Sequence, residues 1–173
     1  MSRVALGFKA RTGRAILVIL AAGEHGPQVF ERSEVALLPE GEFAPYHAAE
    51  DLEPLAARQH VKRSIRSAAA RVLVGPGMPD WSTDEILAVH FRMHKAEGEL
   101  FRDVLVQGAR ECGIALTTLP QKSALDAAAK LLGATRARLD AELAALGKSA
   151  GAPWGAHQKE AAAAALVVLN GRR

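Results

Sequence analysis

The stretch VALGFKARTGRAILVIL, residues 4–20, decides how the chain begins to fold. Its two β-rich runs, residues 4–8 and 16–20, flank Arg11-Thr12-Gly13, and the glycine suits a short hairpin loop. After a turn cluster at residues 23–27, residues 28–38 alternate apolar and polar side chains, as a strand near a sheet edge does. We therefore predict three consecutive antiparallel strands at the start of the chain.

Composition favours one cytoplasmic domain. The chain has 173 residues, 49% of them hydrophobic, so a single domain over residues 1–173 can bury its own core. Cys112 is the only cysteine, which excludes an intramolecular disulfide and fits a core position in a reducing cytoplasm. The apolar run at residues 15–22 is too short to span a bilayer and no cleavable signal pattern precedes it, so no membrane contact is expected. A net charge of +3 is compatible with a phosphate-bearing partner but does not decide for one.

The rest of the chain alternates helical and β-type patterns. Helices are predicted over residues 46–71, from the capping box at Ser82–Glu85 to Cys112 before Gly113, and over 123–132, 135–146 (ended by Gly147) and 157–169. Short β-type runs lie at residues 72–74 and 114–119. This order predicts an α/β fold with a mixed five-stranded sheet, its first three strands antiparallel, its last two parallel, and helices on both faces.

Several segments resemble the ribonuclease H-like superfamily, and in particular its Holliday-junction resolvases of bacterial type. These segments are Ala96-Glu97-Gly98, residues 118–123, residues 132–135 and residues 157–162. The resemblance implies a single ribonuclease H-like domain that acts on nucleic acid. In that family four carboxylates hold two divalent ions that cleave a phosphodiester.

The matching positions imply a degenerate active site. Lys9 stands at the first aspartate position, Gly75 or Pro76 at the second and His157 at the third, so only Glu160 remains. One carboxylate cannot hold two hard cations, and an ammonium would repel them. We therefore do not expect a two-metal nuclease. Lys9 either attracts an anion or extends from a strand end into solvent.

The leading functional hypothesis is a cationic site that binds nucleic acid or a phosphate-bearing ligand. Two guanidinium groups and the turn amides of the hairpin loop would form a phosphate cradle, although the loop is also a plausible solvated hairpin tip. The residues assigned to this site are Lys9, Arg11, Thr12, Arg14, His47, His157 and Lys159.

A second hypothesis concerns the long helix, where His90, His94 and Glu97 fall within the apolar arc. Buried polar groups need partners. The three could hold one divalent transition metal, form a structural hydrogen-bond cluster, or act as a general acid/base site of a hydrolase. In the catalytic version Glu97 is the base, His94 its proton partner, and Glu160 and His157 join from the last helix. A third hypothesis is a non-catalytic assembly module that forms a homodimer through an exposed strand or the alanine-rich last helix.

Overall fold

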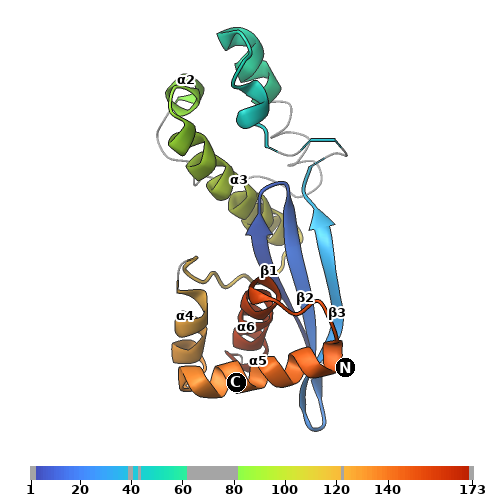
Figure 1. Cartoon of the computed structure of the whole chain (residues 1–173). Coiled ribbons are helices and arrows are strands. Elements are labelled where there is room, and N and C mark those ends of the chain that lie inside the picture. Colours follow the sequence, from blue (N-terminus) through green and yellow to red (C-terminus); the bar gives the residue numbers. More distant parts are fainter. Residues whose placement is uncertain (1–2, 39–40, 43, 62–81, 122, 172–173) are drawn as a thin grey trace. The chain divides into compact units, whose positions relative to one another are not determined.

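The computed structural model describes residues 3–38, 41–42, 44–61, 82–121 and 123–171 (Figure 1). The chain divides into two compact units. The first contains residues 1–9, 16–35 and 117–173, and the second contains residues 10–15 and 36–116. Each unit is described by itself.

The three predicted strands form one sheet in the order β1-β2-β3, with β1 at Val4–Arg11, β2 at Arg14–Gly23 and β3 at Gly26–Ala36. Gly13 has a φ of 71° at the first reversal, a conformation that glycine adopts without strain. The hairpin and the third strand are therefore confirmed.

In the first unit, three helices pack together beside the sheet: α4 (Ala124–Leu131), α5 (Arg136–Ala150) and α6 (Ala156–Gly171), with α6 between α4 and the strands (Figure 1). The alanines of α6 pack on buried Ile16, Val18 and Leu20 of β2. At Gly7 an added Cβ would overlap the carbonyl of Ala161 and lie 2.9 Å from the amide nitrogen of Ala165. The small residues of β1 and α6 thus allow their backbones to touch.

Helix α5 ends later than the sequence predicts. The expected stop was Gly147, but α5 continues to Ala150, before Gly151 at a φ of 76°. Gly147 serves instead as a contact surface, because an added Cβ would lie 2.6 Å from Cγ of Trp154. Trp154 Nε1 also donates a hydrogen bond to the Leu143 carbonyl at 2.9 Å, which fixes the loop before α6.

The second unit contains a short 3-10 helix, η1 (His47–Ala49), helical residues 54–61, α2 (Thr83–Leu87) and α3 (His90–Glu111). The predicted helix over residues 46–71 does not begin at residue 46 as one regular helix, because residues 50–53 separate η1 from the helical residues 54–61. Pro54 lacks an amide donor and disfavours a helical residue before it, so the regular helix begins at Pro54. Residues 62–71 lie outside the described part of the chain.

The predicted capping box is present, since the Ser82 side chain accepts from the Glu85 amide and the Glu85 carboxylate accepts from the Ser82 amide. The prediction of a single long helix from the capping box to Cys112 was wrong. Val89 is extended (φ −140°, ψ 111°) and separates α2 from α3. Arg92 donates to the Glu85 carbonyl across this break at 3.0 Å. The helix does stop at Gly113, whose φ is 64°, but Cys112 is exposed and not part of a core.

The predicted five-stranded mixed sheet was wrong. Residues 114–119 contain no strand, and Ile114 and Leu116 are 49% and 45% exposed. A β-type run becomes a strand only where another strand accepts its hydrogen bonds, and the described residues offer no parallel partner. The other predicted strand, residues 72–74, lies outside the described residues. Among the helices that the structure describes, none has the length and apolar character needed to cross a membrane.

Candidate metal centre

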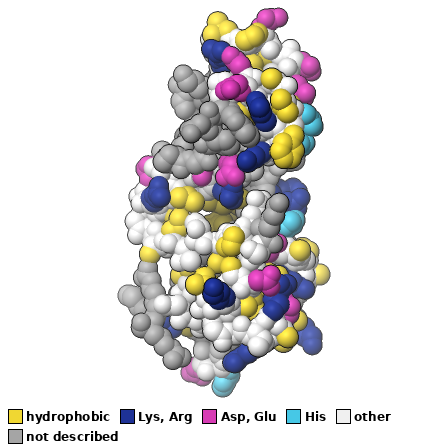
Figure 2. Space-filling view, turned by 90° about the vertical axis from the view of Figure 1, so that its left-hand side faces the viewer, with side chains coloured by type: hydrophobic (Ala, Val, Ile, Leu, Met, Phe, Trp, Pro, Cys, Tyr) yellow, Lys and Arg dark blue, Asp and Glu magenta, His cyan; other side chains and the backbone are white. Residues whose placement is uncertain are grey.

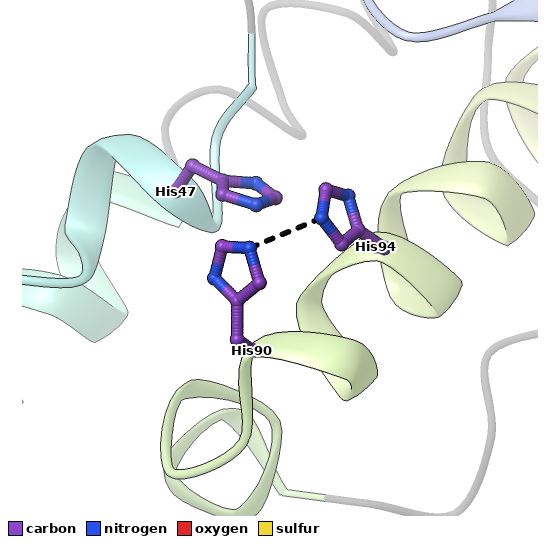
Figure 3. Close-up of side chains that lie close together, drawn as sticks. All are labelled: His47, His90 and His94. Carbon is purple, nitrogen blue, oxygen red and sulfur yellow. Dashed lines mark hydrogen bonds between the residues drawn. The ribbon is translucent and has the colours of Figure 1, made fainter.

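Three histidines of the second unit point toward one another (Figure 3). His47 is the first residue of η1, and His90 and His94 lie in the first turns of α3. One ring nitrogen from each lies within 4.8 Å of the others. The ring centroids are separated by 4.9 Å (His47–His90), 4.5 Å (His47–His94) and 4.7 Å (His90–His94).

Local packing explains why these side chains meet. Because Val89 is extended, His90 becomes the first residue of α3, and the i,i+4 spacing places His94 on the same helix surface one turn later. Beside this surface, a buried apolar cluster joins the segment around η1 to α2 and α3. Its members are Tyr46, Ala49, Ala57, Val61, Ile86, Met93 and Ala96. The cluster brings His47 to the histidine pair.

Glu97 lies behind His47 and fixes its ring. Its side chain is 2% exposed, and both carboxylate oxygens lie 3.0 Å from His47 Nδ1. An ionised carboxylate can only accept, so Nδ1 carries the proton and donates it. His47 Nε2 is then the free acceptor; it is buried and has no hydrogen-bond partner among the described residues. An unsatisfied buried acceptor costs about 1–3 kcal/mol, so a metal ion or a hydrogen-bond donor at this atom would be stabilising.

The two exposed histidines present their Nε2 atoms to each other. His90 Nε2 lies 3.1 Å from His94 Nε2, while His90 Nδ1 lies 3.8 Å from the carboxylate of Glu50. In a tetrahedral zinc site with bonds of about 2.0–2.1 Å, ligand nitrogens are about 3.3–3.4 Å apart. The His90–His94 pair is close to that spacing. A carboxylate behind an imidazole is also the usual support of a metal-ligating histidine.

The negative charge of Glu97 also acts on its other neighbour, Tyr46. Burial of the phenol and, second, the charge of Glu97 raise the pKa of Tyr46 to about 12. Tyr46 is 2% exposed, so little water screens this interaction. The centre therefore has a buried acidic side behind His47 and a water-facing side at His90 and His94.

The sequence placed only part of this centre. It predicted His90, His94 and Glu97 as one polar group inside the buried arc, but only Glu97 is buried, since His90 and His94 lie at the arc's exposed edge. The third convergent nitrogen comes from His47, which the sequence had assigned to a phosphate site. Nothing in the local pattern links His47 to Glu97, 50 residues later.

The residues of the predicted cationic site are divided between the two units. Lys9, His157, Lys159 and Glu160 belong to the first unit, whereas Arg11, Thr12, Arg14 and His47 belong to the second. Lys9 Nζ lies 2.5 Å from Glu160 Oε2. Among the described residues, no donor forms a hydrogen bond with Glu160 Oε2, so its contact with Lys9 is an ion pair.

This ion pair offsets the charge on which the cationic site was based. Next to Lys9 on the strand, the backbone of α6 occupies the space above Gly7. On the face seen in Figure 2, Lys and Arg side chains are scattered among acidic ones and do not form a basic stripe. The arrangement around Lys9 therefore gives no added support to an anion site there.

Comparison with known proteins returned no match among protein-family models, curated proteins or solved structures. The resemblance to ribonuclease H-like resolvases thus rests on the short sequence segments alone.

Proposed function

We propose that this chain binds one divalent transition metal ion through His47, His90 and His94, with Glu97 orienting His47. The observation that carries the proposal is the buried Nε2 of His47, which has no hydrogen-bond partner in the part of the chain that the structure describes, while Glu97 holds Nδ1. One ring nitrogen of each of the three histidines lies within 4.8 Å of the others.

The chemistry of the donors selects the class of metal. Neutral imidazole nitrogens suit zinc, copper, nickel or iron, whereas magnesium and calcium require oxygen ligands. Three protein ligands would leave a fourth position, and the 61% exposure of the His90 side chain gives water access to the cluster. A three-histidine site with a water ligand is the arrangement that activates water for hydrolysis. A metal-dependent hydrolase is therefore the activity that this site supports best.

Metal analysis tests the proposal. Protein purified without an affinity tag and incubated with zinc or cobalt should retain one equivalent of metal after dialysis. His47→Ala and His94→Ala should each lose it, because two imidazoles with water bind far more weakly than three. His25→Ala, which removes an exposed histidine of the first unit, is the matched control and should retain the metal. No retained metal, or equal retention in all variants, contradicts the proposal.

The nucleic-acid hypothesis stays a prediction. Salt-sensitive binding to junction, duplex or single-stranded DNA would support it. The Lys9–Glu160 ion pair argues against Lys9 as its anchor. Cytoplasmic location and a homodimer are likewise predictions, the second of which sedimentation at several concentrations would decide.

A further inference from the structure

We infer that the open position of the metal site takes an anion that carries an aromatic or other apolar group, which packs on Phe91. The inference rests on the proposed function and names the class of ligand for that same site. It depends on two observations, one of charge and one of exposed apolar surface.

The charge observation is the placement of the acidic groups. All three donors are neutral imidazoles when they bind a metal. The two carboxylates next to the cluster, Glu97 and Glu50, both face Nδ1 atoms, of His47 and His90, whereas the Nε2 atom of His90 lies 3.1 Å from Nε2 of His94. Neither of these two carboxylates would be a ligand of the bound dication, so the ion would keep its positive charge, and an anion entering at the open position would meet that charge directly.

The second observation is that the two residues next to His90 in the chain expose apolar side chains. Phe91 is 74% exposed and Val89 is 41% exposed. Phe91 and His94 are i,i+3 neighbours on α3, whose Cβ atoms lie about 5–6 Å apart. At about 100° per residue, Phe91 is displaced from His94 by about 60°, away from the buried arc.

One exposed aromatic residue is ordinary on a protein surface. Its meaning here comes from its place on α3, next to His90 in the chain and three residues before His94, where we infer that a ligand held by the metal would reach the ring. A carboxylate or hydroxamate joined directly to an aromatic ring combines an anionic group and an apolar ring in one small ligand, with the two a few ångströms apart. A bare small anion would leave Phe91 uncovered.

Cobalt provides the test, because its visible spectrum reports on ligands at the open position. Full-length protein loaded with one equivalent of cobalt is titrated with acetate and with benzoate. Benzoate should bind about 5–10-fold more tightly, as expected for partial burial of an aromatic ring. Phe91→Ala should remove this preference while leaving cobalt stoichiometry and acetate affinity unchanged.

Phe30→Ala is the matched control, since Phe30 is 75% exposed but lies on β3 of the first unit. It should retain the full preference for benzoate. Equal affinities for the two anions, or a preference that survives Phe91→Ala, would overturn the inference while the metal site stands. Failure to bind cobalt would reject the proposed function itself and the ligand class with it.

Discussion

Replacement of Glu97 by glutamine should weaken metal binding by about 10–100-fold, or about 1.4–2.7 kcal/mol. Glutamine has nearly the same shape and keeps one oxygen that can accept from His47 Nδ1, so the ring stays in place. The substitution removes the negative charge of the Glu97 side chain, which is 2% exposed and whose Oε1 lies 3.0 Å from His47 Nδ1. Without the charge, His47 becomes a poorer electron donor and a nearby dication loses a favourable interaction.

The assay is competition for zinc between the protein and a coloured chelator of known affinity. Glu99→Gln is the matched control, because Glu99 lies two residues further along α3 and forms an ion pair with Arg102. It should bind zinc as the parent protein does. Zinc affinity that is unchanged in Glu97→Gln would refute the argument that this carboxylate supports a metal ligand.

The same variant carries an internal check on structure. Tyr46 is the chain's single tyrosine, so tyrosinate absorbance reports on it alone. The charge of Glu97 is one cause of its high pKa, and the pKa of Tyr46 should fall from about 12 toward its ordinary value in Glu97→Gln. A pKa that falls only part of the way, and stays above the value of about 10 for an unfolded chain, together with weaker zinc binding, shows that the charge was lost while Tyr46 stayed buried.

Three further predictions concern stability. The pKa of Tyr46 is about 12 in the folded chain and about 10 when unfolded, so the unfolded chain loses the proton first and stability falls by about 2.7 kcal/mol between pH 10 and 12. Denaturant titrations across this range should show the decrease for the parent, and a smaller one for Tyr46→Phe. Gly7→Ala should cost about 3 kcal/mol or more, because its Cβ meets the backbone of Ala161, which cannot rotate away. Gly155→Ala, with only a side-chain atom at 3.5 Å, should change the unfolding free energy by less than about 0.5 kcal/mol, and equal losses in the two variants would contradict the close packing. Gly98→Ala should raise the melting temperature, since its Cβ meets nothing within 4 Å and alanine favours the helix by about 0.8–1 kcal/mol; a lower melting temperature would count against this reasoning.

Features set by neighbouring residues could be read from the sequence. The hairpin depends on a glycine at the reversal, the start of α2 on the side chains of Ser82 and Glu85, and the end of α3 on Gly113. Each of these is decided within a few residues, so the local pattern is sufficient. The predicted parallel strand at residues 114–119 failed for the opposite reason, because a strand requires a distant partner that the pattern does not specify.

Gly147 is a glycine that does not end its helix but allows a close side-chain contact. The sequence indicated a helix end there, but tertiary packing placed the ring of Trp154 against it and the helix continued. The mild helix penalty of a glycine is smaller than the gain from burying a large aromatic side chain.

The local sequence likewise determines only part of the candidate metal centre. The sequence by itself determined that His90 and His94 share one helix surface, since the period of the helix fixes that geometry. Only the tertiary structure decided that His47 joins them and that Glu97 stands behind it, 50 residues away in the chain. That meeting depends on the packing of Tyr46, Ala49 and their neighbours against α3, and the energy of such long-range contacts is not encoded in any single local segment.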